Sequence, residues 1–330
     1  MSGRLQGFYV SVLVSAGMAA AMLADPSAAA QNYPERPVRI VVPYPPGGTV
    51  DVVARVLALN LAEQTGRNFI VDNRAGANGI VGSDIVAKAT PDGYTLLVQA
   101  SIFVINPLFL KNVPYDVQKD FAPVTNIGSV PLLVTAHPSV PAANLREFLA
   151  LVKATGTKYS FATSGLGSAG HLSEEMIKRE AGIPNMLIVP YKGAGPALMD
   201  VMGGQVSAMI DPLPSSYPQV KAGRLKALAV TSAKRVSFMP DVPTVAESGI
   251  RGFDMVSWYG LWGPRGVPKT ITAKLTSETE RATRAPLAVA RLGEQGFEPV
   301  GGGPDAFAKF IAQEIERYAK VVREANIKAE

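Results

Sequence analysis

Four glycine-rich segments hold most of the residues that could contact a ligand. They span residues 43–49, 73–79, 164–170 and 191–196, and each precedes a stretch with helical character. Glycine allows a close backbone approach, and the first N–H groups of a helix lack intrahelical partners. Such a helix end carries about half a positive charge and binds anions without a cationic side chain. The hydroxyls of Thr49, Ser164 and Ser168 could donate further hydrogen bonds to a carboxylate.

Residues 165–170 also match the G-x-G-x-x-G pattern of dinucleotide-binding folds. That function requires an acidic residue at the end of the next strand, and the expected strand at 187–189 is followed by Pro-Tyr-Lys. The segment has no lysine in P-loop spacing, and it does not match the G-x-S-x-G elbow of hydrolases. The pattern therefore favours a carboxylate over a nucleotide as the ligand of this loop.

A secreted serine hydrolase is the catalytic alternative. Ser168 or Ser164 could be activated by His171, with Glu174 and Glu175 a turn further along. The other interpretation is that His171 caps the first turn of a helix or contacts a ligand. We expect a binding protein rather than an enzyme.

Composition narrows the class of protein further. The chain has 330 residues, a formal net charge of +5, no cysteine and two histidines. The lack of cysteine excludes disulfides, Fe–S clusters and thiolate zinc sites, and two histidines make a multi-histidine metal site improbable, so we expect no cofactor and no metal. Basic residues are scattered, and we expect no nucleic-acid partner. The length predicts two lobes.

The first thirty residues differ from the rest. Arg4 is followed by an apolar run at 8–23 and then by Ala28-Ala29-Ala30. A cationic start, an apolar core and small residues before a cleavage site are typical of a secretory signal peptide, and the alternative is an uncleaved anchor. We predict cleavage after Ala30 and an exported mature protein, with no cysteine for a lipid anchor.

The remaining chain alternates short β-rich runs with longer helical stretches. We expect strands at 38–42, 69–71, 94–99, 130–137, 159–163, 187–189, 206–210, 227–231 and 254–262. We expect helices at 50–65, 80–89, 144–153, 172–181, 196–203, 271–283, 287–295 and 304–325. This alternation predicts α/β domains with mostly parallel sheets, whose ligand site lies at the carboxyl ends of the strands.

Nine short motifs follow one another in register along the mature chain. They lie within residues 33–51, 73–79, 91–96, 114–116, 120–124, 189–193, 222–232, 235–249 and 258–264, and they include Pro45-Pro46-Gly47-Gly48, Pro91-Asp92-Gly93-Tyr94 and Trp258-Tyr259-Gly260. In this order they resemble the Bug family, the TctC-type solute-binding proteins of tripartite tricarboxylate transporters.

The resemblance implies a two-lobed periplasmic-binding-protein fold of type II, the Venus-flytrap kind, with two crossovers at its hinge. We place lobe 1 at residues 31–132 and 257–330 and lobe 2 at residues 133–256. The implied function is to capture a small carboxylate between the lobes and deliver it to membrane transporter subunits. A ligand sensor for a membrane signalling partner would need the same fold. We expect a monomer.

The family's use of backbone groups to hold carboxylates points to particular residues of this chain. The ligand-binding candidates are Tyr44, Gly47, Gly48, Thr49, Ser101, Ser164, Gly167, Ser168, Tyr191, Gly193 and Asp211. Asp211 is either a polar anchor for the ligand or a loop-stabilising residue. Trp258 and Tyr259 could stack on an aromatic acid, or they could pack in the core.

Overall fold

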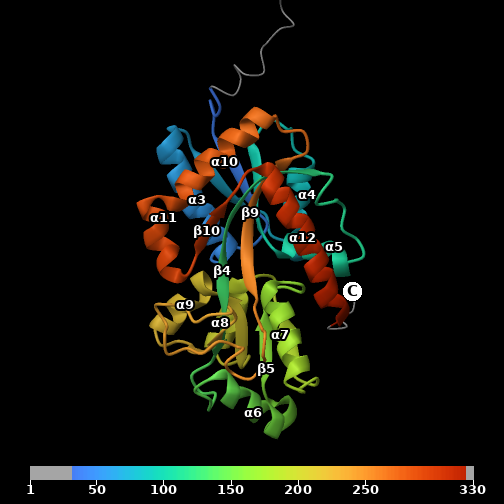
Figure 1. The fold of residues 1–330 in the computed structure, drawn as a ribbon, viewed down its shortest axis with the longest axis vertical. Coiled ribbons are helices and arrows are strands. Elements are labelled where there is room, and N and C mark those ends of the chain that lie inside the picture. Colours follow the sequence, from blue (N-terminus) through green and yellow to red (C-terminus); the bar gives the residue numbers. More distant parts are fainter. Residues whose placement is uncertain (1–31, 325–330) are drawn as a thin grey trace, which may run out of the picture.

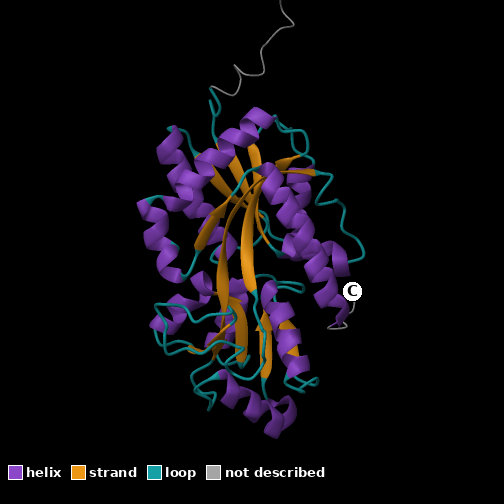
Figure 2. Ribbon diagram, in the orientation of Figure 1, coloured by secondary structure: helices purple, strands orange, loops and turns teal. Residues whose placement is uncertain are grey.

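The structure is a computed structural model, and it describes residues 32–324. These residues form an elongated molecule in which strands β4 (Phe121–Ala136) and β9 (Val256–Pro264) run along the long axis, with helices on both sides (Figures 1 and 2). Within this part of the chain no helix is long and apolar enough to cross a membrane. The predicted signal peptide and its cleavage site lie outside the described residues.

The first sheet region contains the N-terminal strands and the two long ones. Its strand order is β2-β1-β3-β9-β4, with β10 paired to the outer part of β4. The additional strands are β1 (Val38–Val42), β2 (Phe69–Asn73), β3 (Thr95–Ala100) and β10 (Glu298–Gly301). The helices of this region are α3 (Thr49–Thr65), α4 (Ile80–Ala87), α5 (Ile102–Phe109), α10 (Lys269–Arg284), α11 (Pro286–Arg291) and α12 (Pro304–Glu324), with short 3-10 turns η2 (Ala77–Gly79) and η4 (Gly293–Gln295).

Strand β1 shows why this region is covered by helices on both faces. Its sequence Val-Arg-Ile-Val-Val is almost continuously apolar, as expected for a strand that is buried on both sides. Ile40 joins one hydrophobic cluster with Val53 and Leu57 of α3, whereas Val41 joins the other cluster with Val86 of α4. In Figure 1, α3, α10 and α11 accordingly lie on one side of the strands, and α4, α5 and α12 lie on the other.

The second sheet region is built on the inner end of β4. There β4 pairs with β7 (Ala208–Pro212) and β8 (Lys226–Val230), and β7 continues to β5 (Ser160–Thr163) and β6 (Leu187–Pro190). The helices of this region are α6 (Leu145–Thr155), α7 (Ala169–Glu180), α8 (Ala194–Met202) and α9 (Leu213–Lys221), with the 3-10 turn η3 (Gly156–Lys158). β4 is therefore one strand that belongs to both sheet regions.

The prediction of mostly parallel sheets was wrong at the centre of the molecule. The β2-β1-β3 and β6-β5-β7 groups are parallel, but β9 and β4 are antiparallel to their neighbours. β4 also begins at Phe121, nine residues before the expected start at Val130. Its outer half contains Pro123 and Gly128 and two irregularities in its pairing with β9, and these interrupt the apolar pattern by which a strand is recognised.

Three elements were not expected from the sequence, and each contains proline. Helix α5 includes Pro107, α9 includes Pro214 and Pro218, and β10 includes Pro299. Proline interrupts helix and strand hydrogen bonding, so a reading from local pattern treats such segments as loops. In α9 the first proline sits in the opening turn, where the missing N–H has no intrahelical partner in any case.

Candidate functional site

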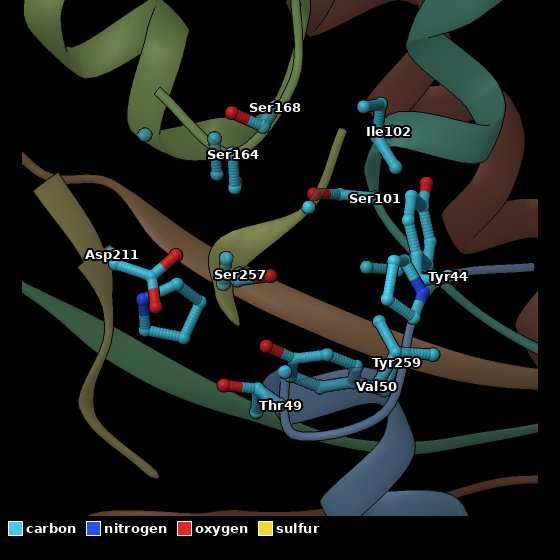
Figure 3. Close-up of a pocket in the computed structure, with 18 residues that line it drawn as sticks. Tyr44, Thr49, Val50, Ser101, Ile102, Ser164, Ser168, Asp211, Ser257 and Tyr259 are labelled. Atoms are coloured by element: carbon cyan, nitrogen blue, oxygen red, sulfur yellow. The ribbon is translucent and has the colours of Figure 1, made fainter. Parts of the chain in front are cut away.

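A cleft opens between the two sheet regions, where loops from both meet. It encloses about 600 Å³ not filled by atoms, part of it open to solvent. Figure 3 shows Asp211 and Ser101 approaching it from opposite sides, with Thr49 and Ser168 on the two remaining sides. The lining consists of Tyr44, Pro45, Gly48, Thr49, Val50, Ala100, Ser101, Ile102, Ser164, Ser168, Ala169, Gly170, Gly193, Ala194, Asp211, Pro212, Ser257 and Tyr259.

The cleft is built at the carboxyl ends of parallel strands. Its residues follow β1, β3, β5, β6 and β7, and they include the first residues of α3, α7 and α8. None of the lining residues is a lysine, an arginine or a histidine. Attraction of an anion to this site would therefore have to come from helix N-termini and backbone N–H groups rather than from cationic side chains of the lining.

Eight of the eleven residues predicted from the sequence line this cleft, which brings the first, third and fourth glycine-rich loops together. They are Tyr44, Gly48, Thr49, Ser101, Ser164, Ser168, Gly193 and Asp211. Gly47, Gly167 and Tyr191 do not line it. Each of these three is engaged in a hydrogen bond within its own loop or with an adjoining helix.

Gly47 stabilises the first glycine-rich loop through a backbone hydrogen bond. Its N–H donates to Asp51 Oδ2 at 3.0 Å, and Asp51 also accepts from Arg55 and Asn73. Burial alone would raise the pKa of Asp51, but the hydrogen bonds from Arg55, Asn73 and Gly47 outweigh that effect and lower it. An ionised Asp51 thus fixes the loop from which Gly48 and Thr49 reach the cleft.

Gly167 and His171 together fix the start of α7. The N–H of Gly167 donates to His171 Nδ1 at 3.0 Å, and the N–H of His171 donates to Ser168 Oγ at 3.1 Å. Ser168 is therefore the N-cap of α7, and its hydroxyl also lies 3.3 Å from Thr163 Oγ1. Burial lowers the pKa of His171 to about 4, so its imidazole is neutral near pH 7.

This geometry argues against the serine hydrolase. A general base must reach the hydroxyl that it deprotonates, but His171 Nδ1 already accepts from Gly167 and Nε2 faces Glu175 Oε1 at 4.0 Å. Between Ser168 and His171 the hydrogen bond runs through the backbone N–H of the histidine and not through its ring. His171 is thus a structural part of the helix start, as the second interpretation held.

Tyr191 and Gly193 have different roles, although both belong to the fourth glycine-rich segment. The Tyr191 hydroxyl donates to Asp200 Oδ2 at 2.6 Å, which holds the ring against α8. Gly193 lines the cleft with φ +124°, and a Cβ there would lie 3.1 Å from Pro45 Cδ of the first loop. A glycine is needed here both for the left-handed backbone and for the close approach of the two loops.

Three buried polar atoms of the lining have no hydrogen-bond partner among the described residues. They are Asp211 Oδ1, Ser101 Oγ and the hydroxyl of Tyr259. Buried polar atoms are almost always paired, so unpaired ones that gather in one cleft indicate atoms available to a ligand. Burial raises the pKa of Asp211 to about 7.

Some lining residues were not among the predicted ligand contacts. Tyr259 was assigned to aromatic stacking or the core, and Ser257 was not singled out. Alternation along β9 separates their roles: Trp258 points into the core and donates to Glu314 at 2.8 Å, whereas Ser257 and Tyr259 face the cleft. That alternation was the available signal, but the side of β9 that faces the cleft depends on its antiparallel pairing.

Among the described residues, cationic side chains and metal ligands do not contribute to the cleft. The second and fourth glycine-rich segments carry the cations Arg74 and Lys192, but neither lines the cleft, and Arg74 donates to Asp72 at 3.0 Å. Within residues 32–324 no three histidine, aspartate or glutamate side chains converge as a metal site requires.

Comparison with known proteins gives consistent similarities over nearly the whole chain. The family model described as tripartite tricarboxylate transporter family receptor matches residues 53–327. Protein BugT of Bordetella pertussis is 38% identical over 318 residues, which cover 96% of this chain and 95% of that protein.

Two solved structures support the architecture. R. palustris Rpa4515 with adipate has a TM-score of 0.87 at 37% identity, covering 90% of this chain and 99% of that one. MatC from Rhodopseudomonas palustris with bound malate has a TM-score of 0.82 at 33% identity, covering 88% and 100% respectively. These similarities confirm the two-lobed α/β fold that the sequence predicted.

Proposed function

The chain belongs to the tripartite tricarboxylate transporter (TctC) receptor family, as its motifs predicted, and on that premise we propose that its cleft captures one small organic carboxylate and presents it to the membrane subunits of such a transporter. The matching family is described as one of receptors, and a similar solved structure is a periplasmic binding protein, which supports a binding role for this chain. The proposed ligand class follows from the adipate and malate bound by the two similar structures.

One observation carries the proposal: the cleft joins several helix N-termini and hydroxyls without a cationic side chain. The starts of α3, α7 and α8 contribute Gly48, Ser168 and Ala194. A carboxylate is small enough to accept from such N–H groups, and it gains from the positive end of each helix. Ligand recognition is thus assigned to the eight predicted residues that line the cleft, together with Tyr259 and Ser257.

Closure of the two lobes is the proposed capture step. We keep the boundaries at 132/133 and 256/257, and the change in the partners of β4 from β9 to β7 after Pro131 supports the first of them. The hydrogen bonds that join the lobes would then include Thr49 Oγ1 to Ser215 Oγ at 3.1 Å and Asn78 Nδ2 to Leu166 O at 2.6 Å. A ligand that contacts both lobes shifts the equilibrium toward this closed state.

The localisation is proposed in the same way. The family is one of periplasmic binding proteins, and the Arg4-to-Ala30 segment supports export with cleavage after Ala30. We propose that the mature protein is a monomer. N-terminal sequencing of protein recovered from the periplasm, and its mass in solution, test these two points.

The ligand class is tested by a thermal-shift screen of the mature protein. We expect succinate, malate or adipate at about 100 times its Kd to stabilise the protein by about 2.7 kcal/mol, which raises Tm by several degrees. Hexane-1,6-diol, which has the length of adipate without its charges, is the control and should have no effect. Mass spectrometry of freshly purified protein should detect a released carboxylate. No shift with any acid, together with no released acid, would contradict the proposal.

Gly48→Val tests whether the first loop contacts the ligand. The backbone of Gly48, at φ −80° and ψ 165°, accepts any residue, so the fold should persist. A Cβ would lie 3.7 Å from Ala194 Cβ, an ordinary contact, but the two further methyl groups of valine would enter the space between the lobes. We expect the affinity for the carboxylate to fall about tenfold or more, with Gly48→Ala close to wild type. Calorimetric titration measures both, and unchanged binding by the valine variant would mean that this loop is only a turn.

A further inference from the structure

The carboxyl group of Asp211 lines the cleft in which the proposed ligand, itself a carboxylate, would bind. Asp211 is the penultimate residue of strand β7, with 1% of its surface exposed, and its side chain points toward the cleft (Figure 3). Two ionised carboxylates in contact repel each other strongly, and burial removes the water that would screen them. The lining has no lysine, arginine or histidine to neutralise Asp211.

The two oxygens of Asp211 have different surroundings. Oδ2 accepts a hydrogen bond from Ser215 Oγ, and Ser215 Oγ in turn accepts from Thr49 Oγ1 at 3.1 Å. The Ser215 hydroxyl also lies 2.9 Å from Pro212 O. Oδ1 is buried and has no partner among the described residues. Oδ1 is therefore the oxygen left for the ligand.

A neutral carboxylic acid has one oxygen that accepts and one that carries the proton. Since Oδ2 already accepts from Ser215, the proton of a neutral Asp211 belongs on Oδ1, the oxygen that has no partner among the described residues. From there it can be donated to an anionic oxygen, and hydrogen bonds between an acid O–H and a carboxylate are among the strongest in proteins.

We propose that Asp211 is a neutral carboxylic acid in the ligand-bound cleft and donates its proton from Oδ1 to a carboxylate oxygen of the ligand. This deepens the proposed function and rests on it, because it concerns how the same cleft distinguishes an anionic ligand. Asp211 then selects for ligands that present an ionised carboxylate at this position and against those that present an ammonium or hydroxyl donor. Each binding event takes up one proton wherever the free protein has Asp211 ionised.

The neighbouring ionisable groups do not supply a positive charge. From α7, Glu174 is fully buried, and from β9 the Tyr259 hydroxyl faces the cleft. Burial raises the pKa of both groups, and Asp211 adds to the shift of each. β4 and β5 have no charged residue, and those of α8 and α9, Asp200 and Lys221, do not line the cleft. Burial raises the pKa of Asp211 itself to about 7, so its proton is exchangeable near neutrality.

The test measures binding of adipate and malate by calorimetric titration at pH 6 and pH 8.5. Both acids are ionised over most of this range, since ordinary carboxyl pKa values lie near 4 to 5. We expect the wild-type affinity to fall by roughly tenfold for each pH unit above about 7. Titrations at pH 8.5 in phosphate and in Tris, which differ in ionisation heat, should report uptake of about one proton per ligand.

Three variants identify the titrating group. Asp211→Asn keeps an acceptor for Ser215 and a donor for the ligand, so it should bind at pH 8.5 at least as well as the wild type and lose the pH dependence. Asp211→Ala removes the donor and should bind weakly at both pH values. Glu174→Gln is the matched control: the amide oxygen can still accept from the Ile210 N–H, and the wild-type pH slope should remain.

The outcomes separate this proposal from the proposed function. Binding of either acid with no proton uptake, or with affinity that rises with pH, overturns the role of Asp211 and leaves the receptor function intact. Loss of binding in Asp211→Asn at both pH values, with the variant folded, shows instead that an ionised Asp211 accepts from the ligand. If no acid shifts Tm in the thermal-shift screen and none is released from the purified protein, the proposed function fails and this proposal fails with it. Should Asp211→Asn not fold, proton uptake by the wild type decides.

Discussion

A Gly170→Ala variant is expected to lose about 3 kcal/mol of unfolding free energy, with Tm lower by about 5 °C or more. Gly170 lies in the first turn of α7, and a Cβ there would fall 2.2 Å from the carbonyl oxygen of Ile210 on β7. A backbone oxygen in a sheet cannot turn aside as a side chain can. The start of α7 must therefore move away from β7.

The same substitution should weaken ligand binding, because the displaced turn carries Ser168 and Gly170, which line the cleft beside the strand that carries Asp211. The control is Gly195→Ala, at the corresponding place in α8, where a Cβ would meet only Pro46 O at 3.6 Å. That variant should be as stable as the wild type or slightly more so, since alanine favours the helix. Thermal unfolding and calorimetric titration of both variants test this. Equal stability of Gly170→Ala and wild type would mean that α7 does not pack so closely on β7.

The outer elements of the fold could be predicted from the sequence because their local patterns are strong. The run at 38–42 matches β1, and helical spacing at 50–65 matches α3 within one residue. The centre could not be predicted in this way. Pro123 and Gly128 conceal the outer half of β4, and the direction of β9 relative to β3 is a property of long-range pairing, which leaves no local pattern.

The candidate site was predictable at the level of loops and less so at the level of atoms. Glycine and hydroxyl residues before a helix indicated three of the loops that meet in the cleft. Whether an N–H is free for a ligand depends on tertiary contacts. Gly47 is committed to Asp51, and Gly167 is committed to His171. Neither hydrogen bond follows from the spacing alone, since a loop can turn either way.

The fold should also become less stable as pH rises through the titration of Asp211. Its pKa is raised to about 7 in the folded protein, against about 3.9 in an unfolded chain. The folded state therefore binds this proton more tightly, so its contribution to stability is complete below about pH 4 and is lost as pH rises to about 7. About three pKa units correspond to about 4 kcal/mol.

Asp211→Asn isolates this contribution from all other titrations. Its advantage in unfolding free energy over the wild type should grow between pH 4 and pH 8 by about 4 kcal/mol, as measured by urea unfolding without ligand. Asp51→Asn should show the opposite pH dependence of the difference in unfolding free energy. The pKa of Asp51 is lowered in the folded protein, so the stability that this carboxylate contributes is present above its unfolded pKa and is lost in acid. A pH-independent difference for Asp211→Asn would mean that the carboxyl is ionised throughout. An acid that is ionised throughout could not serve the cleft as a proton donor. Growth of the difference with pH would instead show that the protein gives up stability near neutrality to keep a protonated donor in its cleft.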